Sequence, residues 1–132
     1  MKNFTKNFIK HLLIIVSLLV FLSPKSNATI IAYETAMKST KPFALYIYMN
    51  GCPYCRMFDP VFERLSQKYS YKYNFVRAEY RNGIMPQLCQ KWNVRGFPFM
   101  ALINPKTNSG KRVPLDCMNN DDCLIKSLQT FP

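Results

Sequence analysis

Two cysteines separated by two residues carry the clearest chemistry in this sequence. Cys52 and Cys55 enclose Pro53 and Tyr54, and the apolar run before them ends at Asn50-Gly51. A proline directly after Cys52 suits the first turn of a helix, where unpaired N–H groups and the helix dipole favour an anion. A helix N-terminus lowers the pKa of a thiol, and the thiolate is the form that attacks disulfides. We therefore expect Cys52 to be the attacking thiolate and Cys55, one turn further along and more buried, to be the resolving thiol.

A Cys-x-x-Cys pair is also half of many zinc sites. The other half would have to be Cys117 and Cys123, but five residues separate these two, and the only histidine, His11, lies in a segment that we expect to be removed. Without that histidine the remaining chain has no Ser–His or Cys–His nucleophile. We predict no metal and no cofactor.

The first 28 residues have the three regions of a secretory signal peptide. Lys2, Lys6 and Lys10 supply the positive start, Leu12 to Leu22 is a run of 11 uncharged residues, and Ser26-Asn27-Ala28 has small residues at the cleavage positions. A membrane-spanning helix needs about 20 apolar residues, so the run is short for an uncleaved anchor. We expect cleavage after Ala28 and a periplasmic protein, with secretion as the less favoured alternative.

Cleavage would leave residues 29–132, which are enough for one hydrophobic core. Four of the 18 basic residues leave with the leader, so the net charge falls from +11 to +7. A basic surface can steer acidic partners, although a solvated surface is the simpler interpretation. Export argues against nucleic acid as a partner. We expect a monomer whose partners are exported proteins with thiols or disulfides and a membrane-bound or soluble redox protein.

The remaining sequence alternates helical and strand patterns within one domain. Helices are expected over residues 30–38, 53–69, from about 84 to about 92, and from about 121 to 129. Apolar runs predict strands over residues 43–49, 73–79, 99–103 and 111–115, the last two forming a hairpin. The resulting order, α-β-α-β-α-β-β-α, belongs to the α/β class.

Two segments resemble the active-site segments of thioredoxins. The stretch from Cys52 has a basic residue, Arg56, after the second cysteine and a proline, Pro60, eight residues after the first. The segment Lys91-Trp92-Asn93-Val94-Arg95-Gly96-Phe97-Pro98 is similar to the one that leads to the thioredoxin cis-proline. The resemblance covers essentially all of residues 29–132. It implies the thioredoxin fold, a central mixed β-sheet flanked by helices.

The resemblance also implies roles for individual residues. The bond between Phe97 and Pro98 is expected to be cis, with Pro98 beside Cys52 and with backbone at Phe97 and Pro98 that pairs with an extended substrate. The resemblance makes Pro53, Tyr54 and Arg56 accessory residues of the Cys52–Cys55 pair. The Pro-Tyr dipeptide also occurs in glutaredoxins, and here we interpret it as tuning the reactivity of the pair. Arg56 either favours the thiolate or is a solvated helix residue.

Two positions depart from the thioredoxin pattern. Gly51 stands where thioredoxins usually have a tryptophan, and Tyr46 stands where they bury an aspartate. The missing carboxylate leaves open whether a protein base helps to deprotonate Cys55.

The other three cysteines have more ordinary explanations. In an oxidising compartment Cys117 and Cys123 are expected to form a structural disulfide, with a second redox pair as the alternative. Cys89 is expected to be a buried small hydrophobic residue.

The sequence thus predicts an enzyme, a thiol–disulfide oxidoreductase that exchanges disulfides with exported proteins through Cys52, Cys55 and a cis-proline. The alternative is a non-catalytic thioredoxin-fold module that binds proteins and keeps Cys52–Cys55 as a static disulfide. The pattern leaves the direction of electron flow open.

Overall fold

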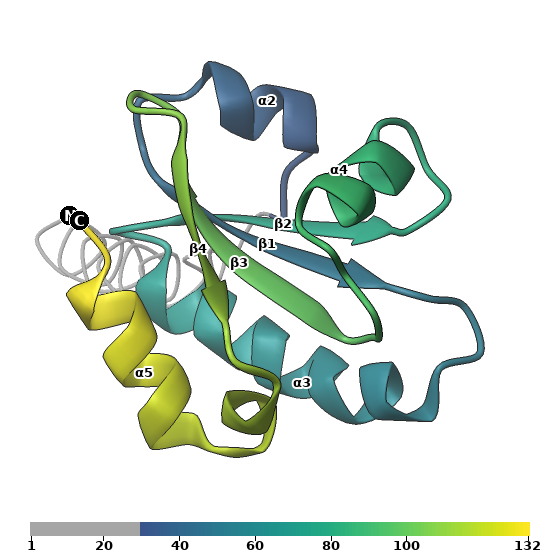
Figure 1. The fold of residues 1–132 in the computed structure, drawn as a ribbon. Helices are drawn as coiled ribbons and strands as arrows, with labels where there is room; N and C mark the ends of the chain where they lie inside the picture. Colours follow the sequence, from purple (N-terminus) through teal and green to yellow (C-terminus); the bar gives the residue numbers. More distant parts are fainter. Residues whose placement is uncertain (1–29) are drawn as a thin grey trace, which may run out of the picture.

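The computed structural model describes residues 30–132, which form a four-stranded sheet with helices on both faces (Figure 1). The expected signal peptide, residues 1–28, lies outside the described residues. No helix within residues 30–132 is long and apolar enough to cross a membrane.

The sheet is mixed and has the strand order β2-β1-β3-β4. Strand β1 (Phe43–Tyr48) pairs in parallel with β2 (Asn74–Glu79) and antiparallel with β3 (Phe99–Asn104). Strand β4 (Ser109–Val113) completes an antiparallel hairpin with β3. Five of the six residues of β1 are fully buried, as expected for a strand that is covered on both faces.

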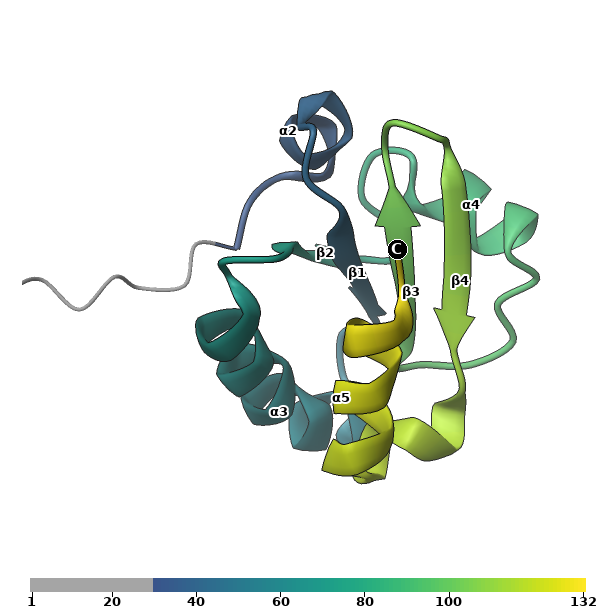
Figure 2. The ribbon, with the colours of Figure 1, turned by 90° about the vertical axis from the view of Figure 1, so that its left-hand side faces the viewer.

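Two pairs of helices cover the two faces of the sheet (Figures 1 and 2). Helices α3 (Pro53–Tyr69) and α5 (Asp121–Thr130) lie on one face, and α2 (Tyr33–Lys38) and α4 (Met85–Lys91) lie on the other. The core under α3 is rich in aromatic rings, and the Tyr46 ring lies 5.0 Å from the rings of both Phe58 and Phe62. This layered sheet is the thioredoxin fold that the sequence predicts.

Several expected boundaries were wrong by one or more residues. The first helix begins at Tyr33 and not at Ile30, because Ile30 and Ile31 extend the sheet beside Phe75 instead. Strand β1 ends at Tyr48. Strand β2 begins at Asn74, since the N–H of Tyr73 bonds to the carbonyl of Tyr69.

The last strand was also misplaced. It covers Ser109–Val113, and Pro114, which has no N–H to give to a sheet, ends it. A short 3₁₀ helix, η1 (Leu115–Asn119), follows in place of the expected strand end and turn. This element carries Cys117 to the start of α5.

Candidate active site

Cys52 lies at the junction between β1 and α3 and caps the helix with its own sulfur. It is the N-cap residue of α3, and Pro53 occupies the first helical position. The Cys55 N–H donates to Cys52 Sγ over 3.2 Å. One of the otherwise unpaired N–H groups of the helix end therefore points at this sulfur. A thiolate at Cys52 would accept this hydrogen bond more strongly than a thiol.

Cys52 and Cys55 are joined in a disulfide, with their Cα atoms 5.3 Å apart. Both residues are buried, with 6% of Cys52 and 2% of Cys55 exposed. The expected difference in burial between the two cysteines is therefore small in this disulfide form. Their neighbours Pro53, Tyr54 and Arg56 are all exposed.

Gly51, directly before the pair, has a backbone that explains the absent tryptophan. Its φ is +80°, a conformation in which any residue with a Cβ is strained. The space around it is open, since a Cβ there would meet no atom within 4 Å. The backbone conformation, and not crowding, is what favours glycine.

The segment before β3 closes the other side of the site. The Phe97-Pro98 bond is cis, as predicted. The carbonyl oxygen of Phe97 lies 3.7 Å from Cys52 Sγ, and the Phe97 ring lies 5.2 Å from the Tyr80 ring, centroid to centroid. Two segments 45 residues apart in the sequence thus meet at the sulfur of Cys52.

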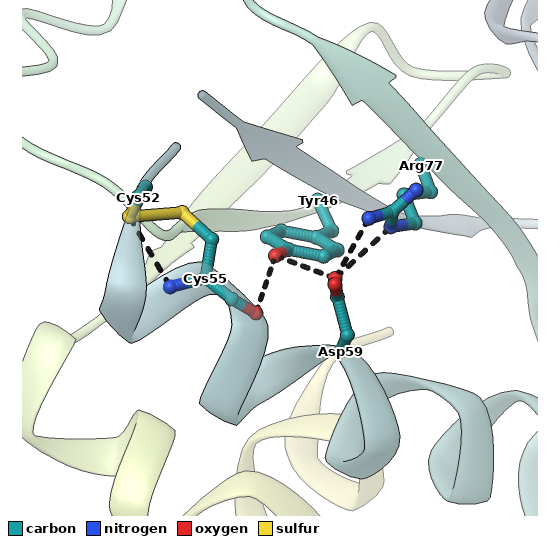
Figure 3. A network of polar contacts seen from close by, with 5 residues as sticks. All are labelled: Tyr46, Cys52, Cys55, Asp59 and Arg77. Atoms are coloured by element: carbon teal, nitrogen blue, oxygen red, sulfur yellow. Dashed lines mark hydrogen bonds and ion pairs between the residues drawn. A yellow bond between two sulfur atoms is a disulfide. The ribbon is translucent and has the colours of Figure 1, made fainter. Parts of the chain in front are cut away.

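A polar network that the sequence analysis missed lies behind the disulfide (Figure 3). The Tyr46 hydroxyl lies 3.2 Å from the Cys55 carbonyl oxygen and 3.0 Å from Asp59 Oδ1, and it can donate to either. Arg77 donates to the same Asp59 oxygen through Nε and Nη2, over 3.1 and 2.9 Å. Its guanidinium also lies 3.9 Å from the centroid of the Tyr48 ring. The network ties the first turns of α3 to β1 and β2.

Burial and the network act together on the ionisation of Tyr46. Loss of solvation raises the pKa of Tyr46, and the hydrogen bond to Asp59 raises it further. For Arg77, burial lowers the pKa, but the hydrogen bonds to Asp59 and the charges of Asp59, Tyr48 and Tyr46 together raise it more and leave a net increase. The position that holds an aspartate in thioredoxins is therefore a neutral hydrogen-bond donor here. The carboxylate nearest to it in this network is Asp59, one helical turn after Cys55.

The second cysteine pair lies where η1 meets α5. Cys117 and Cys123 form a disulfide with their Cα atoms 5.1 Å apart, as expected. The N–H of Cys123 donates to the Asn120 side chain, over 3.1 Å, and not to sulfur.

Cys89 is the cysteine outside both disulfides. It is half-buried on α4, and its pKa is raised by that burial. Within residues 30–132 there is no group of three or more His, Cys, Asp or Glu side chains that could hold a metal ion.

These features can now be set beside known proteins. A family model described as Thioredoxin matches residues 25–129. The chain belongs to the thioredoxin family. Proteins of this family are thiol–disulfide oxidoreductases, and the Cys52–Cys55 disulfide is the corresponding Cys-x-x-Cys group in this chain.

Curated relatives share the domain and are longer proteins. The chloroplastic thioredoxin-like protein HCF164 of Arabidopsis thaliana is 28% identical over 111 residues, which cover 80% of this chain and 42% of the relative. The 5'-adenylylsulfate reductase-like protein 5 of Oryza sativa subsp. japonica is 35% identical over 65 residues, which cover 49% of this chain and 21% of the relative. The chain spans less than half the length of either relative.

Solved thioredoxins share the fold. A thioredoxin from Thermus thermophilus superposes with a TM-score of 0.63 at 16% identity, over 78% of this chain and 85% of that one. Thioredoxin f from spinach chloroplast superposes with a TM-score of 0.61 at 19% identity, over 76% and 89% of the two chains. At these identities the likeness concerns the fold alone.

Proposed function

We propose that this thioredoxin-family protein is an exported oxidoreductase that exchanges disulfides with exported proteins through Cys52 and Cys55. One observation carries the proposal. The sulfur of Cys52 caps helix α3 and accepts an N–H, and it lies beside the carbonyl of the residue before a cis-proline. The first contact favours a thiolate, and the second offers a backbone acceptor to an incoming extended segment.

The exchange takes place in two displacements. In the reduced protein the Cys52 thiolate attacks one sulfur of a substrate disulfide, so a Cys52–substrate disulfide forms and the other substrate sulfur leaves as a thiolate that takes up a proton. The Cys55 thiolate then attacks Cys52 Sγ, closes Cys52–Cys55 and releases the second substrate thiolate. Two electrons pass from the protein dithiol to the substrate disulfide. A dithiol donor restores the protein, and the reverse steps oxidise a substrate dithiol.

Trapping of the intermediate tests the assignment of the two cysteines. With Cys55→Ser, a peptide disulfide should form a stable adduct on Cys52, and mass spectrometry should find the peptide mass on that residue. With Cys52→Ser no adduct should accumulate on Cys55, because only 2% of Cys55 is exposed. An adduct on Cys55 in Cys52→Ser together with none in Cys55→Ser would reverse the assignment.

Reduction of the unchanged protein by a dithiol donor separates the proposal from the alternative of a non-catalytic binding module. Such a module would keep Cys52–Cys55 as a static bond that a dithiol donor does not open under conditions that reduce a thioredoxin. A measured reduction potential for the pair would also give the direction of electron flow, because strong oxidants and thioredoxin-like reductants differ by roughly 150 mV.

The exported location is supported by the leader pattern of residues 1–28. Determination of the N-terminal sequence of the purified natural protein tests it. A start at Thr29 supports the signal peptide, and a chain that retains Met1 contradicts it.

A further inference from the structure

An apolar hollow of about 270 Å³ opens beside the redox pair. Its walls come from the first turns of α3, the cis-proline segment and η1, and they include Tyr54, Phe58, Phe97, Pro98, Leu115 and Met118. No charged side chain lines it. Pockets for small-molecule ligands usually measure about 300–1,000 Å³, so this hollow suits a single side chain better than a cofactor.

The hollow is continuous with the place where exchange occurs. Phe97, whose carbonyl lies 3.7 Å from Cys52 Sγ, forms part of its wall. Tyr54, which lies between the two cysteines in the sequence, forms another part. A segment that reaches Cys52 along the backbone of Phe97 and Pro98 therefore lies beside the hollow. Tyr54 and Leu115 are 68% and 61% exposed, so both have apolar surface free to cover such a segment.

A second hollow of about 260 Å³ adjoins the first and carries positive charge. The two share Gly96, Pro98 and Leu115, and the second adds Arg95 and Arg112. A Cβ on Gly96 would meet no atom within 4 Å, so the surface between the two hollows is open.

Arg112 is held in place by the protein. It donates to the backbone carbonyls of Trp92 and Asn93, and its guanidinium lies 5.1 Å from the centroid of the Phe99 ring. Arg95 is exposed. The result is a groove that is apolar at the end near Cys52 and basic at the other end.

We propose that this groove binds an extended segment of the protein substrate that carries an apolar side chain next to its cysteine and an acidic side chain further along. The apolar side chain occupies the hollow near Cys52, and the acidic one faces Arg95 and Arg112. The inference rests on the proposed function and adds the class of substrate. The net charge of +7 over residues 29–132 favours the same acidic partners.

The Cys117–Cys123 disulfide contributes to this groove through its position. Met118 follows Cys117 directly in η1, and the disulfide ties η1 to α5. The bond therefore fixes one wall of the apolar hollow without itself facing Cys52.

Designed peptide disulfides test the inference. Reduced protein is mixed with disulfide-linked homodimers of Glu-Leu-Cys-Leu-Glu, Glu-Ser-Cys-Ser-Glu and Lys-Leu-Cys-Leu-Lys, and the second-order rate constants are divided by those of dithiothreitol with the same peptides. Leucine on both sides of the cysteine serves either direction of binding. Exchange of leucine for serine should lower the ratio about tenfold. Exchange of glutamate for lysine should lower it about threefold, and this difference should shrink as salt is added.

Variants locate each preference in the groove. Leu115→Ser should abolish the preference for leucine, and Arg95→Glu should reverse the preference for glutamate. Ile84→Ser and Lys106→Glu are matched controls, because these exposed residues lie outside both hollows, and both should leave the preferences unchanged.

Bis(2-hydroxyethyl) disulfide, which is too small to span the groove, separates failure of this inference from failure of the proposed function. If the protein reacts with this compound but treats the three peptides alike, the groove inference is overturned and the oxidoreductase assignment stands. If it reacts with neither, the proposed function fails and the inference falls with it.

Discussion

Cys52–Cys55 and Cys117–Cys123 both lie at the start of a helix, and their Cα atoms are 5.3 and 5.1 Å apart. In each pair one cysteine is the third residue of its helix, Cys55 in α3 and Cys123 in α5. Similar distances and similar helix positions therefore do not distinguish the two disulfides.

The helix caps do distinguish them. At α3 the cap is sulfur, since Cys52 Sγ accepts the N–H of Cys55, and the first turn has no acidic residue. At α5 the cap is Asn120, whose side chain takes the N–H of Cys123, and Asp121 and Asp122 add negative charge to the first turn. A helix end stabilises a thiolate only where its N–H groups are available to sulfur. The comparison therefore supports the proposed exchange at the first pair and favours a structural role for the second.

The largest expected difference between the pairs is in activity. The Cys52→Ser, Cys55→Ser double variant should lose at least about a thousandfold in catalysed exchange with bis(2-hydroxyethyl) disulfide, because it lacks the nucleophile. The Cys117→Ser, Cys123→Ser double variant should retain this activity at low temperature. If the second variant folds normally but no longer turns over, Cys117–Cys123 is a redox relay and the comparison fails.

For stability, loss of Cys117–Cys123 should have a larger effect than loss of Cys52–Cys55. The Cys117–Cys123 loop spans six residue steps and the Cys52–Cys55 loop three, so loss of the first bond releases more chain entropy. It should lower the free energy of unfolding by about 2 kcal/mol, and the Tm by about 10 °C. Thermal denaturation followed by circular dichroism measures this loss in both double variants. If removal of Cys52–Cys55 lowered the stability more, the active pair would be the disulfide that contributes most to the stability of the fold.

Two buried tyrosines sharpen the comparison, because one lies behind the exchange site and the other does not. Tyr46→Phe removes the hydroxyl that faces Cys55 and Asp59. Tyr73→Phe removes one that donates to the Leu128 carbonyl over 2.7 Å. Each should cost about 1 kcal/mol of stability in urea denaturation. Only Tyr46→Phe should slow exchange, by several-fold, because only its network positions the first turns of α3. Equal effects on exchange would make the network purely structural.

A further effect of Tyr73 is expected on stability at alkaline pH. Burial raises the pKa of Tyr73 to about 12, against about 10 in an unfolded chain. The folded protein keeps this proton between pH 10 and 12 while the unfolded chain loses it. The stabilisation is therefore complete below pH 10 and declines as the pH rises through 12. Tyr73→Phe should make the decline shallower, by at most about 1.4 kcal/mol per pH unit. If stability declined with pH equally steeply in the variant and the unchanged protein, the raised pKa of Tyr73 would be contradicted.

Most of the site could be predicted from local sequence. The apolar run of β1, the turn at Gly51 and the proline after Cys52 each act on their immediate neighbours, so the strand, the helix start and the position of Cys52 followed from the residues themselves. The thioredoxin-like segment ending at Pro98 predicted the cis bond.

The missed parts depend on partners distant in the sequence. Tyr46 and Arg77 are opposite each other in the parallel register of β1 and β2, and no local pattern specifies a register across 31 residues. Asp59 follows Cys55 by four residues, a spacing that places both on one side of a helix. This spacing was the available clue, but it identifies the neighbour of Cys55 and not the partner on β2.

The residue types and their local spacing thus determined that this chain has a sulfur at a helix end, and the resemblance to thioredoxins supplied the proline segment beside it. Only the tertiary structure decided what surrounds that sulfur. The reason is physical, because helix starts and turns depend on contacts within a few residues, whereas the tyrosine network and the groove arise where α3, the cis-proline segment, β2 and η1 pack together. Leu115 illustrates this, since Pro114 ends the strand in which it was expected and η1 carries it to the wall of the groove.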